Sequence, residues 1–198
     1  MFPDADRREL EEGWEDRWRD FHRPVRVGSL WVGPPWERPP EDAVSVVIDP
    51  GRAFGTGAHP TTRLCLEFLL ELPRSSLLDV GCGSGVLAIA AARLGYGPVT
   101  AVDVAEVAVE ATLANAAENG VELRALVLDA LREPLPAAEL VLANVALEVV
   151  SAIGGRISSP RLLGAGYLVS GEPAPEGFER VDRRELDGWA ADLFVRCG

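Results

Sequence analysis

The chain contains no lysine: all 19 of its basic residues are arginine, against 31 acidic residues, for a formal net charge of -12. The missing lysine excludes a Walker-type phosphate loop, which needs a Gly-Lys-Ser/Thr sequence. The excess of acid argues against a broad basic surface of the kind that binds nucleic acid without sequence preference. A basic protein or a small molecule is the easier partner to expect, although this net charge also simply favours solubility.

Cysteine and long apolar runs are also scarce. Cys65, Cys82 and Cys197 lack metal-ligand spacing and an even count, so we interpret them as small packing residues. No apolar run approaches the length of a membrane span. Polar residues follow Met1 where a secretory signal would have a basic start and an apolar stretch, so we expect no such signal and a cytoplasmic location.

The most informative stretch is SSLLDVGCGSG, residues 75–85, followed by an Ala- and Leu-rich run over residues 86–95. The pattern predicts a short strand, a tight turn and a helix. Gly81, Gly83 and Gly85 can adopt backbone angles closed to other residues, so the main chain can approach a ligand while the helix amides point toward it. We therefore expect a nucleotide-like cofactor here, with a turn that binds no ligand as the alternative.

Two cofactor classes use such a turn. Gly83, Gly85 and Ala88 fit the dinucleotide pattern G-x-G-x-x-G/A, and Asp103 follows about twenty residues later. Asp79 favours the other class, because an acid at the strand end would repel a pyrophosphate but could accept a hydrogen bond from the ammonium group of a methionine moiety. The sequence thus resembles a class I S-adenosylmethionine-dependent methyltransferase.

A second glycine-rich loop, DPGRAFGTGAHPTT over residues 49–62, precedes an amphipathic helix predicted for residues 61–72. Pro60 suits the first helical position and leaves the amides of Thr61 and Thr62 at the positive end of the helix dipole. That end could bind a carboxylate, or the loop could be an ordinary one capped by threonine.

This loop, together with LLDVGCGSG, resembles the signature of the ribosomal protein L11 methyltransferase (PrmA) family, and the Trp-rich residues 14–36 resemble that family's linker. The resemblance implies S-adenosyl-L-methionine as cofactor, with contacts at Phe54 and Thr62, and N-methylation of a protein amine. Family members carry a further amino-terminal domain that this chain is expected to lack. A small-molecule methyltransferase and a non-catalytic cofactor-binding partner subunit therefore stay open as alternatives.

Three more polar residues lie at the end of a predicted strand or directly after it. Asp103 ends the strand over residues 99–104, where its carboxylate can accept hydrogen bonds from both ribose hydroxyls. Asp129 follows a strand over residues 123–128 and either meets the adenine amino group or is a solvated loop acid. Asn144 follows a strand over residues 139–143 and is the candidate catalytic residue.

Asn144 opens the sequence Asn-Val-Ala-Leu, which resembles the Asn-Ile-Leu-Ala form of the ribosomal protein enzymes. The aromatic residue that would stack on a flipped base is missing, which argues against methylation of nucleic-acid bases. The resemblance implies that Asn144 also contacts the cofactor. His59 is the alternative as a base, but a structural role for it is favoured.

The whole pattern predicts an α/β fold: a Rossmann-like, mostly parallel sheet with an antiparallel edge strand and helices on both faces. We expect residues 1–42 to form a helix and linker packed on a methyltransferase domain over residues 43–198. A fifth strand is predicted at residues 167–170 and an antiparallel hairpin at residues 178–181 and 193–197. EPAPEG stands where the family usually has another helix, so we expect a more open acceptor side.

Overall fold

The computed structural model describes residues 23–51 and 57–198. The amino-terminal helix predicted for residues 4–21 and the candidate contact Phe54 therefore lie outside the described residues. Nothing in the structure tests the boundary predicted between residues 42 and 43, which stays a prediction. Within the described part of the chain, no helix is both long and apolar enough to cross a bilayer.

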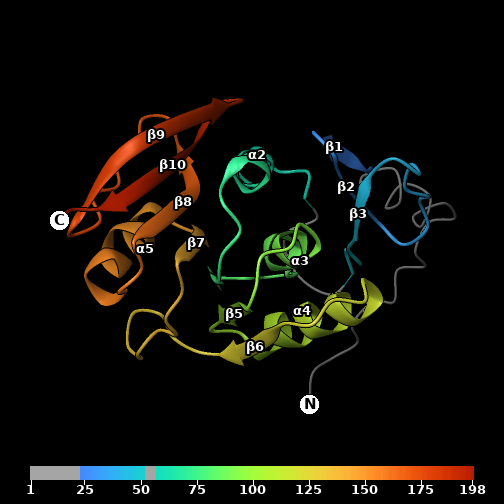
Figure 1. The fold of residues 1–198 in the computed structure, drawn as a ribbon, viewed down its shortest axis with the longest axis horizontal. Helices are drawn as coiled ribbons and strands as arrows, with labels where there is room; N and C mark the ends of the chain where they lie inside the picture. The colour runs from blue at the N-terminus through green and yellow to red at the C-terminus, as the bar shows by residue number, and fades with distance from the viewer. Residues whose placement is uncertain (1–22, 52–56) are drawn as a thin grey trace, which may run out of the picture.

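A seven-stranded sheet forms the centre of the molecule, in the order β6-β5-β4-β7-β8-β10-β9 (Figure 1). Its strands are β4 (Leu77–Val80), β5 (Val99–Asp103), β6 (Arg124–Val127), β7 (Leu140–Asn144), β8 (Arg161–Leu168), β9 (Phe178–Leu186) and β10 (Trp189–Arg196). The strands from β6 to β8 pair in parallel, and β10 pairs antiparallel with both β8 and β9. The predicted mostly parallel sheet is confirmed, with its antiparallel strand one position in from the edge.

Helices cover the two faces unequally. One face packs against α2 (Pro60–Glu71), α3 (Val86–Arg93) and part of α4 (Glu106–Glu118), which together bury residues such as Phe68, Ile89 and Ala116. The other face carries α5 (Leu147–Ile153) and a 3-10 turn, Gly154–Arg156. Residues 169–177 contain no helix, as predicted for EPAPEG; Pro173 and Pro175 are buried, and the amide of Ala174 donates a hydrogen bond of 3.3 Å to the Oγ of Ser151 in α5.

A second, three-stranded sheet lies beyond α3, away from the main sheet (Figure 1). It contains β1 (Val25–Val27), β2 (Leu30–Gly33) and β3 (Val44–Val47), with β2 and β3 parallel. The Asn119 side chain bonds both the amide and the carbonyl of Val47 at 2.7 Å, so α4 holds the small sheet to the main body.

Two sequence predictions were wrong in position. The fifth strand, predicted at residues 167–170, is β8, which spans Arg161–Leu168. Its first six residues were missed because Gly164 and Gly166 weaken the strand signal of this stretch. The hairpin strands extend farther than predicted, to a two-residue turn at Asp187 and Gly188. Both turn residues have positive φ, 50° and 81°, as expected for a turn that matches the twist of the strands.

Candidate active site

The glycine-rich turn connects β4 to α3 as predicted. Gly81, Gly83 and Gly85 have φ values of 74°, 55° and 81°, in the left-handed region that favours glycine. At Gly85 a Cβ would also lie 2.9 Å from the Oγ1 of Thr112, so no larger side chain fits without a shift. The turn thus brings its backbone to the carboxyl edge of the sheet, directly before the start of α3.

A cavity of about 180 Å³ opens beside this turn, above the ends of β4, β5 and β6. Its walls are mostly apolar, and Gly81, Asp103 and Asp129 also line it; the apolar residues include Val80, Val102, Val104, Leu128, Leu131, Val145 and Val149. An apolar slot with a few polar groups at its rim suits a flat heteroaromatic group such as adenine.

Asp103 is fixed to the turn by two backbone amides. Its Oδ2 accepts a hydrogen bond from the amide of Gly83 at 3.0 Å, and its Oδ1 accepts one from the amide of Ala105, also at 3.0 Å. A carboxylate oxygen can accept more than one hydrogen bond, so both oxygens keep capacity for a ligand. The structure brings Asp103 to the cavity, and its contact with a ribose stays a prediction.

Asp79 is the most unusual group of the site. Its side chain is only 2% exposed, and its Oδ2 has no hydrogen-bond partner among the described residues. Burial raises the pKa of Asp79 to about 7, against a lowering by the hydrogen bond with the Ala88 backbone, and the charge of Asp103 raises it further. A buried carboxyl with an unpaired oxygen is suited to a cationic ligand group, because a positive charge would favour its ionised form.

Asn144 meets the start of α2 at the end of β7. Its Nδ2 donates a hydrogen bond of 3.3 Å to the Oγ1 of Thr62, a buried residue in the first turn of that helix. The next residue, Val145, lies so close to Gly81 that a Cβ on the glycine would clash with its side chain. Residues from the two glycine-rich motifs and from β7 therefore converge at one place.

Two predicted site residues have structural contacts. The Nδ1 of His59 accepts a hydrogen bond from the amide of Thr61 at 3.3 Å, and its ring packs edge-to-face on Trp189 with centroids 4.6 Å apart. This capping role agrees with the favoured structural interpretation of His59. Asp129 lines the cavity, yet its Oδ1 also accepts from the amide of Leu131 at 2.9 Å. Both interpretations of Asp129 therefore stay open.

Sequence reasoning missed the polar residues of α4 that support the turn from behind. Thr112 donates to the carbonyl of Gly83 at 3.1 Å, and Asn115 donates to the carbonyl of Ser84 at 2.9 Å. Together with Asn119 they form a row at helical spacing of three and four residues. Polar side chains on one face of an otherwise Ala-rich helix are the signal that could have identified them.

The strand order, the glycine turn and the cavity beside it define a class I methyltransferase. Among solved structures, a ribosomal protein L11 methylase from Lactobacillus delbrueckii matches with a TM-score of 0.79 and 26% identity, over 88% of this chain and 99% of that one. The 16S rRNA methylase RmtB shares the fold, with a TM-score of 0.56 and 18% identity over 69% of this chain and 62% of that one.

The particular family follows from the sequence comparison. The model of the ribosomal protein L11 methyltransferase (PrmA) family matches residues 5–172, and the chain belongs to that family. A relative of that name from Symbiobacterium thermophilum is 42% identical over 94% of this chain, and one from Legionella pneumophila is 39% identical over 93%. The chain spans 66% and 69% of the length of these two curated relatives.

Membership in this family implies S-adenosyl-L-methionine as the methyl donor, and the residues present fit that molecule. The Oδ2 of Asp79, which no described residue bonds, suits its ammonium group, and the apolar cavity suits its adenine. The described residues contain no cluster of His, Cys, Asp and Glu that could bind a metal ion.

Proposed function

We propose that this chain is an S-adenosylmethionine-dependent N-methyltransferase that acts on an amine of a protein such as ribosomal protein L11. The acceptor is suggested by the names of the relatives, of which the chain spans about two thirds, and by its own negative charge. The observation that carries the proposal is the hydrogen bond between Asn144 and Thr62 beside the glycine turn, because it gathers the residues expected to hold donor and acceptor.

Cofactor binding is assigned to the turn and to the two aspartates beside it. Gly81, Gly83 and Gly85 admit the donor close to the backbone, Asp79 accepts a hydrogen bond from its ammonium group, and Asp103 accepts from its ribose. The bound donor supplies an activated methyl group with its own leaving group. The protein's main task is to align donor and acceptor, which can lower the barrier by about 7 to 11 kcal/mol.

Asn144 is assigned the role of orienting the acceptor. Its Nδ2 is engaged with Thr62, so its Oδ1 is the atom that would accept a hydrogen bond from the incoming amine and direct the lone pair toward the methyl carbon. His59 already caps α2, and we propose no side chain as a strong base. An acceptor lysine would lose its proton because desolvation lowers the pKa of an amine.

Transfer of labelled methyl groups tests this proposal. The purified chain is incubated with labelled cofactor and, in separate reactions, ribosomal protein L11, whole ribosomes and a metabolite extract, with Asn144→Ala as the matched control. We expect label in the ribosomal protein and at least about a hundredfold less with the variant. Label confined to the metabolites would identify a small-molecule methyltransferase. Cofactor binding without any transfer would favour a non-catalytic subunit.

A further inference from the structure

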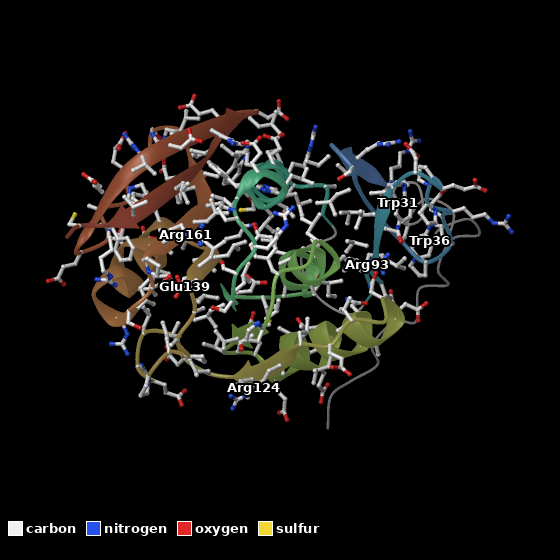
Figure 2. The ribbon with its side chains drawn as sticks, in the orientation of Figure 1. Trp31, Trp36, Arg93, Arg124, Glu139 and Arg161 are labelled. Carbon is white, nitrogen blue, oxygen red and sulfur yellow. The ribbon has the colours of Figure 1, made fainter. Side chains whose placement is uncertain are left out.

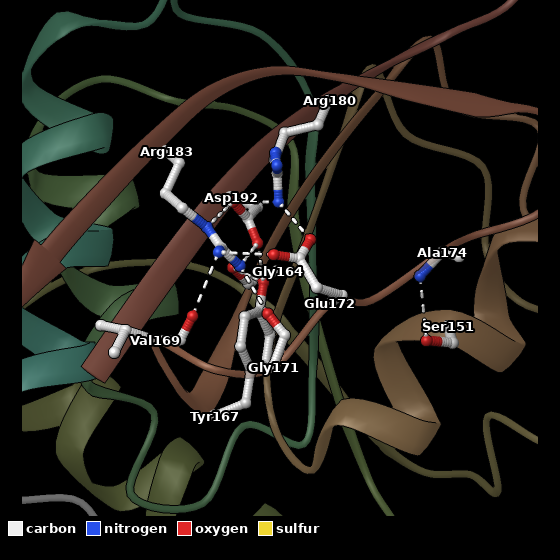
Figure 3. A network of polar contacts seen from close by, with 10 residues as sticks. All are labelled: Ser151, Gly164, Tyr167, Val169, Gly171, Glu172, Ala174, Arg180, Arg183 and Asp192. Carbon is white, nitrogen blue, oxygen red and sulfur yellow. Dashed lines mark hydrogen bonds and ion pairs between the residues drawn. The ribbon is translucent and has the colours of Figure 1, made fainter. Parts of the chain in front are cut away.

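An ion pair between a buried aspartate and a half-buried arginine lies on the side of β7 opposite the cofactor cavity, within the carboxy-terminal hairpin. Asp192 of β10 is fully buried, and Arg183 of β9 binds both of its oxygens, Nε to Oδ1 at 2.8 Å and Nη2 to Oδ2 at 2.9 Å (Figure 3). The hydroxyl of Tyr167, at the end of β8, lies 2.9 Å from the same Oδ2. We call these three residues the arginine clamp.

The clamp holds the segment that follows β8. Nη2 of Arg183 donates to the carbonyl of Gly171 at 2.7 Å and Nη1 to that of Val169 at 3.3 Å. Nη1 also lies 3.2 Å from a carboxylate oxygen of Glu172, which pairs with Arg180 at 2.8 Å. One guanidinium thus connects a buried carboxylate to the backbone carbonyls of Val169 and Gly171, in a segment that is not helical (Figure 3).

The held segment packs against the start of α5. A Cβ on Gly171 would lie 2.6 Å from the Cδ1 of Leu147, and a Cβ on Gly166 would meet the backbone of Val145. On its other side, Val145 contacts Gly81 of the cofactor turn. Residues 144–147, which begin with Asn144, are therefore packed between the cofactor turn and the segment that the clamp holds.

From these contacts we infer that Arg183 is a positioning residue, which acts through residues 169–172 to fix residues 144–147 on the acceptor side of the site. The inference rests on the proposed methyl transfer. Stability alone explains the clamp poorly, because an ion pair that takes a carboxylate out of water contributes little over a well-packed apolar replacement. The fork of the guanidinium, which bonds a carboxylate and two carbonyls at once, is a geometric feature that lysine cannot reproduce. The hairpin also lies beyond residue 172, where the match to the family model ends.

The test compares two conservative variants with a neighbouring control. Arg183→Lys keeps the charge but loses the fork, and Tyr167→Phe removes one hydroxyl. Arg184→Lys is the control, because Arg184 bonds Glu71 and lies over the Phe68 ring, away from residues 169–172. For each protein we would measure turnover, cofactor Kd, acceptor KM and amide hydrogen exchange.

For Arg183→Lys we expect a loss of turnover of at least about tenfold at saturating cofactor and acceptor, since small misplacements near a reacting centre are costly. Cofactor Kd should change by less than about threefold, and the amides of Val145, Val149 and Gly171 should exchange faster. Tyr167→Phe should show the same pattern more weakly, and Arg184→Lys should resemble the unmodified chain.

The inference is wrong if Arg183→Lys leaves exchange at these amides unchanged, or if exchange accelerates while turnover is normal. It is also wrong if turnover and cofactor affinity fall together with the melting temperature, as in a generally loosened fold. If the unmodified chain transfers no methyl group, the proposed function fails first. Amide hydrogen exchange at Val145 and Gly171 in Arg183→Lys still decides, separately, whether the clamp orders this part of the site.

Discussion

At the scale of single residues, two aspartates at the same sheet edge have opposite environments. Asp103 accepts hydrogen bonds from two backbone amides, whereas one oxygen of the buried Asp79 has no partner among the described residues. The first is a preformed acceptor held in place, and the second is a group whose charge becomes favourable only when a cation arrives. This contrast supports the proposal that Asp103 binds the ribose and Asp79 the ammonium group.

The raised pKa of Asp79 predicts a pH dependence of cofactor binding. Because folding raises this pKa from 3.8 to about 7, the folded chain holds a proton that the unfolded chain releases, and stability falls as the pH rises from about 4 to 7. A cofactor ammonium group favours the ionised carboxylate, so binding below about pH 7 should release a proton and weaken as the pH falls. Calorimetric titrations in buffers of different ionisation enthalpy measure this release.

Asp79→Asn supplies the control for that titration. The amide cannot ionise, so the variant should bind the cofactor more weakly, release no proton at this position, and be more stable than the unmodified chain at neutral pH. Equal proton release by the variant and the unmodified chain would rule out Asp79 as its source.

Removal of the Asp103 side chain should weaken cofactor binding. A charged acceptor that bonds two hydroxyls contributes about 1.5 to 3 kcal/mol, so we expect Asp103→Ala to raise the cofactor Kd at least about tenfold. Asp129→Ala, measured in parallel by calorimetry, separates an adenine contact from a loop acid. Unchanged affinity in a folded Asp103→Ala protein would refute the ribose assignment.

At the scale of elements, α4 connects the cofactor turn to the small sheet. Thr112 and Asn115 bond carbonyls of the turn, and Asn119 bonds the backbone of Val47. The same helix therefore supports the turn from its middle and anchors β3 through its C-cap residue.

Asn119→Ala should detach this anchor. It removes both hydrogen bonds to Val47 and leaves their backbone partners less well satisfied, so the free energy of unfolding should fall by about 2 kcal/mol. Urea unfolding measures the difference, with the exposed neighbour Glu118→Ala as the control. A loss no greater than that of the control would show that the small sheet does not depend on Asn119.

At the scale of the whole molecule, local sequence patterns predicted those parts of the fold in which a sequence motif directly follows a strand. The glycine turn, the strand ends at Asp103 and Asn144, and the parallel sheet follow from apolar runs that end in polar residues. The strand before the turn, predicted to end at Asp79, continues one residue further to Val80. Figure 2 shows the side chains that fill the layers between these elements.

The rest depends on contacts between residues distant in sequence. Asn144 and Thr62 are 82 residues apart, and Tyr167 is 25 residues from Asp192, so no local pattern indicates that they meet. The length of β9 was underestimated because its sequence, FERVDRREL, is dominated by charge. Arg183 and Arg184 lie on that strand, and tertiary packing leaves both half-buried and pairs them with Asp192 and Glu71.

We propose that methyl transfer takes place at Asn144, and the decisive test is the single-turnover rate of the unmodified chain and of Asn144→Ala. At saturating cofactor, we predict a rate at least about a hundredfold lower in the variant, with cofactor affinity changed less than about tenfold, because an orienting residue acts in the transition state. If Asn144 only supported the fold, the variant would lose about 1 kcal/mol of stability in a melting curve and keep its rate. A normal single-turnover rate in Asn144→Ala would show that Asn144 does not orient the acceptor.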